Sequence, residues 1–266
     1  MATGSFPVPV WDTRTERVAF RVGRGWKGWP GGVAWSADGR ELAVADNEGH
    51  AARVAVVSVH GARIGTVHEQ PNLDVVSVSL GKDNFLATTA RDQRDNPSLW
   101  YVRIWDWKQD KLLRRFGPGS GDAVYDRTGD LLVSHRIIEG LAEVWNPETG
   151  RKVSTLSGHT AVLTGLSFTR DGKRVATASG DGSVRIWDPR TGALQVVLQG
   201  PDAIGASGVQ FGPDGSELVS TGYDGIVRVW ALGIDDLTKI ARDRLTRGLT
   251  RAECRQYLHA DRCPAA

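Results

Sequence analysis

Alternating apolar and polar residues recur along most of the chain and predict β-strands. A strand that buries one face has apolar side chains at every second position, and residues 41–45, 174–179 and 217–221 show this alternation. An Asp-Gly pair lies shortly before each run, at residues 38–39, 171–172 and 214–215. Asp-Gly between alternating runs is a strong indication of a tight hairpin turn. The pattern therefore predicts antiparallel hairpins and an all-β fold.

A second pattern, β-branched residues followed by Trp, recurs at a nearly constant spacing. It ends at Trp11, Trp105, Trp145, Trp187 and Trp230. The last three intervals are 40, 42 and 43 residues, and the first gap of 94 residues is about two periods. Residues 53–57 form a degenerate copy within that gap, which places Val56 at the Trp position. A fixed period of this length indicates a repeat architecture.

The most complete copy identifies the kind of repeat. Residues 158–188 contain Gly158-His159, an Asp-Gly turn at 171–172, Asp181-Gly182 and Trp187-Asp188. This combination resembles the WD-repeat family, in which each repeat of about 40–45 residues supplies four strands of a propeller blade. The resemblance covers residues 7–232 and implies an all-β WD-repeat β-propeller within residues 1–233. Its five repeats would span residues 12–57, 58–106, 107–146, 147–188 and 189–231.

The resemblance also implies hydrogen-bonded sets within the blades. In the family, a His, an Asp, a Ser or Thr and a Trp form such a set. The matching residues are His159, Thr177, Asp181 and Trp187 in one repeat, and Ser220, Asp224 and Trp230 in the next, which lacks the His. A buried indole N–H needs an acceptor, and a hydroxyl accepts it while donating onward. We therefore expect structural sets that join strands, and no catalytic residues.

The other repeats depart from this pattern. Thr88 and Asp92 are the matching residues for Trp105. Trp145 has Glu139 at the Asp position and no matching His. The family's set is therefore expected to be incomplete in these repeats.

The sequence does not decide whether the blades close into a ring. Residues 8–11 are predicted to form an isolated third strand of a blade, ahead of the five repeats. In a closed ring, a strand at 17–21 would complete the last blade. Three arrangements are compatible with this order: the C-terminal part of a longer propeller, which the isolated strand favours, a five-bladed ring, or a ring completed by another chain. An open arc would leave unpaired strand edges.

Residues 234–266 predict a short helical tail. Asp235 or Asp236 can cap a helix that continues to residue 247, and residues 250–253 form a capping box for a second helix. Residues 249–264 resemble the tail that follows WD repeats in large actinobacterial signalling proteins, which join a propeller to NTPase, kinase or transcription-regulator regions. The simpler alternative is a helical lid on the last blade.

Charge and cysteine content exclude several classes of protein. Lys and Arg number 33 and Asp and Glu 31, a net charge of +2, so no general attraction to nucleic acid or acidic membranes is expected. No signal peptide or membrane span is recognisable, and we expect a cytoplasmic location. Cys254 and Cys263 are free thiols, a local disulfide, or metal ligands together with His259, although zinc would need a fourth ligand.

Two loops are candidate partner-binding sites. Residues 23–32 contain Trp26 and Trp29, and residues 91–98 contain Arg91, Asp92 and Arg94. In a propeller these loops emerge on one face, and Trp and Arg are enriched at binding hot spots. The alternative is that both Trp side chains fold inward.

We find no motif for a cofactor or metal. The leading hypothesis is a protein–protein interaction scaffold or sensor module of a bacterial signalling system. Its partner would be another protein or upstream domains of a signalling protein, with no nucleic acid, membrane or small-molecule substrate. The alternatives are a propeller-type hydrolase and a non-functional fragment of a larger WD-repeat protein.

Overall fold

The computed structural model describes residues 7–49, 51–69, 71–92, 100–116, 120–136, 139–200 and 205–233. All regular secondary structure in these segments is β-strand, and none of them contains a helix. The predicted all-β fold is confirmed. The predicted helical tail, Cys254, Cys263 and Arg94 lie outside the described residues, as does the side chain of Asp92.

The strands form antiparallel sheets in sequence order, and we call each sheet a blade. Blade 1 contains β1 (Val8–Asp12) and β2 (Arg17–Val22). Blade 2 contains β3 (Trp29–Trp35), β4 (Glu41–Glu48), β5 (Ala51–Ser58) and β6 (Arg63–His68). Blade 3 contains β7 (Leu73–Leu80), β8 (Phe85–Asp92), β9 (Trp100–Asp106) and β10 (Lys111–Phe116).

The second half of the chain continues the series. Blade 4 contains β11 (Ser120–Tyr125), β12 (Leu132–Arg136), β13 (Ala142–Trp145) and β14 (Lys152–Leu156). Blade 5 contains β15 (Leu163–Phe168), β16 (Val175–Ser179), β17 (Ser183–Trp187) and β18 (Leu194–Gln199). Blade 6 contains β19 (Ala206–Phe211), β20 (Glu217–Gly222) and β21 (Val227–Ala231).

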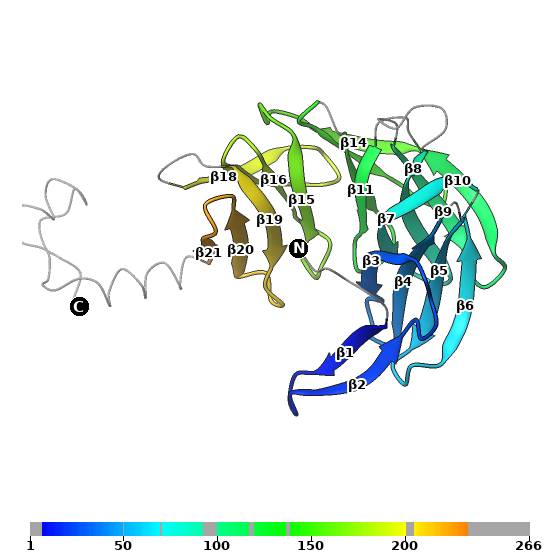
Figure 1. Cartoon of the computed structure of the whole chain (residues 1–266). Helices are drawn as coiled ribbons and strands as arrows, with labels where there is room; N and C mark the ends of the chain where they lie inside the picture. Colours follow the sequence, from blue (N-terminus) through cyan, green and yellow to red (C-terminus); the bar gives the residue numbers. More distant parts are fainter. Residues whose placement is uncertain are drawn as a thin grey trace, which may run out of the picture.

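The blades stand around a common axis, with one inner strand from each of blades 2 to 6 beside it (Figure 1). These inner strands, β3, β7, β11, β15 and β19, contact one another in that order. They line a cavity of about 460 Å³. Glycines permit the close approach: a Cβ on Gly32 would lie 2.7 Å from the Cα of Ser77 in the next blade. The arrangement is that of a β-propeller.

The Asp-Gly turns connect the first and second strands of a blade. In blade 5 the Asp171 carboxylate accepts hydrogen bonds from the Thr169 hydroxyl at 2.7 Å and from the backbone N–H of Lys173 at 3.1 Å. Gly172 has a φ of +67°, a conformation that residues with a Cβ rarely adopt. The dipeptide thus supplies both the capping oxygen and the left-handed residue of the turn.

Strand register corrects one alignment made from the sequence. Val175 of β16 pairs with Trp187, and Leu42, at the same place in blade 2, pairs with Val57. Val57 therefore occupies the Trp position, and the prediction of Val56 was wrong by one residue. The reason is the turn to the outer strand, since Val57 pairs with Arg63 whereas Trp187 pairs with Leu194. That turn is one residue shorter in blade 2.

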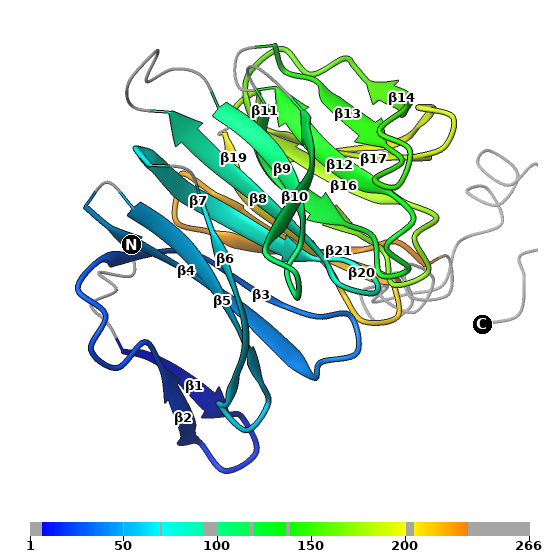
Figure 2. The same cartoon turned by 90° about the vertical axis from the view of Figure 1, so that its right-hand side faces the viewer.

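The two ends of the blade series do not close on each other. β2 pairs with β1, so it does not complete the last blade, as a closed ring would require. β21 has no outer partner strand among the described residues. Figures 1 and 2 show blade 1 lying against blade 2, at the opposite end of the arc from blade 6. Val8, Val10 and Phe20 pack there on a cluster that includes Leu42 and Val44.

Candidate functional site

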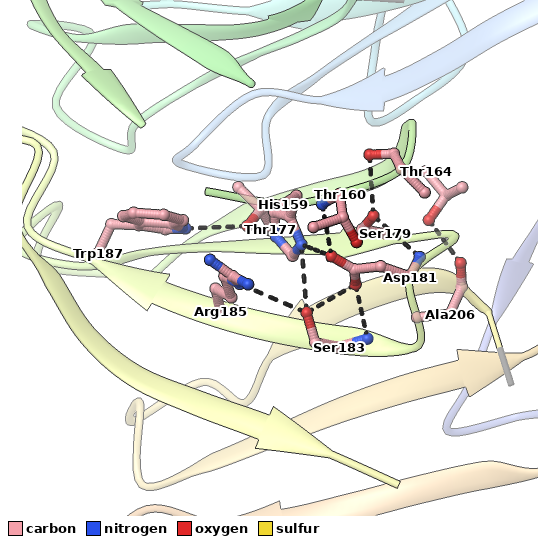
Figure 3. A network of polar contacts seen from close by, with 11 residues as sticks. His159, Thr160, Thr164, Thr177, Ser179, Asp181, Ser183, Arg185, Trp187 and Ala206 are labelled. Carbon is pink, nitrogen blue, oxygen red and sulfur yellow. Dashed lines mark hydrogen bonds and ion pairs between the residues drawn. The ribbon is translucent and has the colours of Figure 1, made fainter. Parts of the chain in front are cut away.

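The structure brings His159, Thr177, Asp181 and Trp187 together inside blade 5 (Figure 3). The Trp187 indole N–H donates to the Thr177 hydroxyl at 2.9 Å. Thr177 Oγ1 lies 2.7 Å from Nε2 of His159, and Nδ1 of His159 lies 2.8 Å from Oδ2 of Asp181. The set thereby joins β16, β17 and the loop before β15.

The ionisation states of His159 and Asp181 determine which atoms donate and which accept in this hydrogen-bond network. Burial lowers the pKa of His159, although the hydrogen bond and charge of Asp181 act the other way. Burial alone would raise the pKa of Asp181, but hydrogen bonds from Ser183, Thr160 and His159 hold it well below the usual range. A neutral His159 therefore donates from Nδ1 to the carboxylate and accepts the Thr177 hydroxyl at Nε2. Each polar side chain of this set therefore has a hydrogen-bond partner. None of them is left with a free basic or nucleophilic atom.

Blade 3 contains a related set with a residue that the sequence reasoning missed. The Trp105 indole N–H donates to the Thr88 hydroxyl at 3.0 Å, and that hydroxyl donates to Glu69 at 2.5 Å. Glu69 precedes the inner strand, as His159 does in blade 5. Arg103 lies 3.8 Å from Glu69, and their side chains are 2% and 0% exposed. A buried carboxylate paired with a buried guanidinium thus replaces the His and Asp of blade 5.

Blades 4 and 6 contain shorter sets. The Trp145 indole donates to Ser134 at 3.2 Å, and the Trp230 indole donates to Ser220 at 2.8 Å. Glu139, the expected acidic partner in blade 4, instead pairs with Arg136 at 3.2 Å. In blade 6 the Asp224 carboxylate pairs with Arg228 at 2.6 Å. Each carboxylate therefore pairs with an arginine of its own blade.

Blade 2 replaces the hydroxyl–indole pair by two valines. Val44 and Val57, at the Thr and Trp positions, are 0% and 2% exposed. Removing both partners of a buried hydrogen bond leaves no unsatisfied group, so this exchange can be nearly neutral for stability. Arg53 binds the buried Asp46 carboxylate at 2.7 Å, and its guanidinium lies 5.2 Å from the ring centroid of Trp26.

The candidate partner-binding residues fall into two groups. Trp26 is partly buried and packs on the cluster between blades 1 and 2, whereas Trp29 is 47% exposed. Asn47, which pairs with Trp29 across β3 and β4, bonds both the N–H and the C=O of Val75 in blade 3.

Arg91 lies at the same end of blade 3 as this contact. It pairs with the Asp74 carboxylate at 3.1 Å, next to Val75. Trp29 and Arg91 thus belong to neighbouring blades that are tied together at this end, and we call these two residues with Asn47 and Asp74 the rim cluster.

No group of three or more His, Cys, Asp or Glu side chains in the described segments could hold a metal ion. In those same segments, no helix is long and apolar enough to cross a membrane.

Comparisons with known proteins agree with this architecture. Residues 150–188 and 192–231 each match the family described as WD domain, G-beta repeat. The chain is 36% identical over 84 residues to eukaryotic translation initiation factor 3 subunit I of Danio rerio, which is 32% of this chain and 26% of that protein. It is 27% identical over 188 residues to a B-type cell cycle switch protein of Medicago truncatula, covering 66% and 37% of the two chains.

Coronin-7 of Bos taurus is 32% identical over 96 residues, which is 36% of this chain and 9% of that protein. The chain thus spans between 9% and 37% of the length of these three relatives.

Proposed function

This chain belongs to the WD-repeat β-propeller family, and from that premise we propose that it is a protein–protein interaction module and not an enzyme. The polar sets inside the blades support this proposal, because each described set links strands and presents no reactive group. One of the relatives is named as a subunit of an initiation factor, and another as a cell cycle switch protein.

The rim cluster is the observation that carries the proposal. Trp29 is a large, exposed aromatic side chain at the start of β3, and Arg91 is a partly exposed cation held in an ion pair with Asp74. Rigid aromatic and Arg side chains contribute most of the binding energy in many interfaces. Asn47 fixes the two blades relative to each other, so a partner would meet both residues in one orientation.

More specifically, we propose that the partner is a regulatory or signalling protein in the bacterial cytoplasm. It is supported by the resemblance of residues 249–264 to the tails of actinobacterial WD-repeat signalling proteins. In this proposal the partner is another protein or a neighbouring domain of a signalling protein, and the blades serve as a scaffold.

Affinity enrichment with quantitative mass spectrometry tests the proposal. The full chain and its Trp29→Ala variant would be used as baits in extracts of the cells that express the protein. Lys173→Ala is the matched control, because Lys173 is 82% exposed and lies in a turn between first and second strands, at the other end of a blade. We expect at least one protein whose recovery falls tenfold or more with Trp29→Ala and is unchanged with Lys173→Ala. Equal recovery with all three baits would refute binding through the rim cluster.

A further inference from the structure

The wall of the axial cavity carries an uneven distribution of charge. The cavity lies at the end of the blades where turns join first and second strands, and Arg127 of blade 4 and Arg170 of blade 5 line it. The single carboxylate among its described lining residues is that of Asp126, which is 3% exposed. This carboxylate accepts the Thr128 hydroxyl at 2.6 Å and the backbone N–H of Leu131 at 3.0 Å. Its oxygens therefore hold their own turn, and the exposed charge of the wall is positive.

Arg127 and Arg170 differ from the other basic side chains of the turns between first and second strands. Those others each have a hydrogen-bond or ion-pair partner within the protein, and they are Arg40, Lys82, Lys173 and Arg174. Arg127 and Arg170 are exposed, and no hydrogen bond or ion pair joins either of them to another residue that the structure describes. Two guanidiniums on neighbouring blades are thus available to an anion.

Two buried hydroxyl groups of the cavity wall also have a proton to donate. Ser79 and Ser167 line the cavity, each one residue before the end of its inner strand, and are 8% and 3% exposed. Their oxygens accept the backbone N–H groups of Tyr125 and Phe211, both at 3.0 Å. A hydroxyl donates one hydrogen bond in addition to those it accepts, and within the described segments neither serine donates. Buried donors are normally satisfied, so an acceptor inside the cavity would complete them.

The cavity continues outwards beyond Arg170. A second hollow of about 560 Å³ lies between the turns of blades 5 and 6. The two hollows share Thr169, Arg170 and Pro213 as lining residues. The carboxylates of Asp171 and Asp214 lie on the outer hollow. A ligand that follows this path away from the axis therefore meets cations first and carboxylates afterwards.

We propose that this path binds an acidic residue in a loop of a partner protein. Its inner part, which we call the arginine mouth, consists of Ser79, Arg127, Ser167 and Arg170. The arginine mouth lies at the opposite end of the strands from the rim cluster, so it is a second contact surface. The inference deepens the interaction function proposed above and rests on it, because the occupant is a protein.

The two hollows together define the chemistry of this loop. An Asp or Glu carboxylate in the inner hollow accepts hydrogen bonds from the guanidiniums and the serine hydroxyls, and charge-assisted hydrogen bonds of this kind are the stronger ones. Farther out, Asp171 and Asp214 favour a Lys or Arg that follows the acidic residue and disfavour a second acidic residue. A free dicarboxylic acid would fill the inner hollow alone, whereas an extended loop fills both.

Blocked synthetic peptides test the arginine mouth. One, two or three glycines separate a Glu from a Lys in these peptides, and binding to the ¹⁵N-labelled full chain is followed by shifts of its backbone amide NMR signals. We expect at least one peptide to bind at millimolar concentration or below, with shifts concentrated in residues 125–128 and 166–171. Replacing its Glu by Gln should weaken binding about tenfold, and added salt should weaken it as well.

Variants of the chain locate the contact. Exposed ion pairs contribute little each, so Arg127→Gln and Arg170→Gln should each weaken binding about threefold and the double variant about tenfold. Both side chains are exposed, so the double variant is expected to keep the parent's melting temperature. Arg40→Gln is the matched control, because Arg40 is 82% exposed in the corresponding turn of blade 2 and lines neither hollow. It should leave peptide binding unchanged.

Four results would overturn the inference. They are the absence of binding by every peptide at millimolar concentration, binding that the double variant does not change, binding of free glutarate as tight as that of the best peptide, and self-association of the chain, seen by light scattering, that depends on the two arginines. The third result would assign the mouth to a small acid, and the fourth to a second copy. Partner recovery through Trp29 would stand in each case, because Trp29→Ala is tested without the peptides and changes the other end of the strands.

The converse result is also distinguishable. Equal recovery with the Trp29→Ala bait would refute binding through the rim cluster, and the peptide titration would still decide whether the arginine mouth binds a carboxylate.

Discussion

Thr177 is the junction of the polar set in blade 5, and replacing it by Val tests how that set contributes to stability. Its hydroxyl accepts from Trp187 and donates to His159, and Thr177 itself is 0% exposed. Valine has nearly the same shape, and Val44 occupies the corresponding position in blade 2. The substitution therefore removes two hydrogen bonds with little change in packing.

The cost follows from the two partners that lose their bonds. The Trp187 N–H and the His159 Nε2 stay buried, and each unsatisfied buried group costs about 1–3 kcal/mol. With two such groups, we expect Thr177→Val to lower the free energy of unfolding by about 4 kcal/mol, the middle of a summed range of about 2–6 kcal/mol. Thr177→Ser keeps the hydroxyl and removes one methyl group, for which about 1 kcal/mol is expected.

Urea unfolding followed by circular dichroism measures these differences. A double-mutant cycle with Trp187→Phe, which removes the indole N–H, isolates the Thr177–Trp187 bond, and a coupling energy of about 1 kcal/mol is expected. A loss below about 0.5 kcal/mol for Thr177→Val, the size of an ordinary surface substitution, would refute the reasoning. So would a loss no larger than that of Thr177→Ser.

Three further predictions concern other parts of the molecule. Glu69→Gln retains an acceptor for Thr88 but removes the buried carboxylate charge that lies 3.8 Å from Arg103, so about 3 kcal/mol of unfolding free energy should be lost; a urea midpoint equal to that of the parent chain would contradict this. Burial lowers the pKa of His159 below the ordinary histidine value of 6.5, so the unfolded chain takes up a proton first as the pH falls. The melting temperature should therefore fall as the pH drops below about 6.5, and less so in a His159→Gln variant; identical pH profiles would exclude His159 as the cause. Trp26→Ala should lower the melting temperature by several degrees because Trp26 packs on the blade 1–2 cluster, whereas exposed Trp29 should tolerate Ala within about one degree. Equal shifts would show that both rings have the same structural role.

Local patterns in the sequence determined the strands, the hairpin turns and the most complete polar set. Strand alternation and the Asp-Gly turns depend on neighbouring residues, so they can be read without knowing the fold. His159, Thr177, Asp181 and Trp187 could be assigned because their spacing matches a family pattern. In each case the information lies within one repeat.

Contacts between segments distant in sequence decided the rest. Glu69 joins Thr88 and Trp105 because the loop before β7 returns to the second strand of its blade, and no local spacing marks a Glu for that place. Arg91 was predicted as a candidate partner-binding residue, and its ion pair with Asp74, which strand pairing sets opposite it, could not be predicted from local spacing. The sequence shows which side chains can form hydrogen bonds or ion pairs. Their partners depend on which other segment of the chain the fold places beside them.

The exposure of the tryptophans depends most on tertiary structure. Trp11 and Trp187 stand at the same position of the same repeat pattern, yet one is exposed and the other buried. The repeat fixes that both lie on third strands, since this depends only on local spacing. Burial of the indole ring depends on whether a second strand and a neighbouring blade cover it. Only the three-dimensional arrangement of the blades decides this, because the residues of a strand do not determine which other strands pack against it.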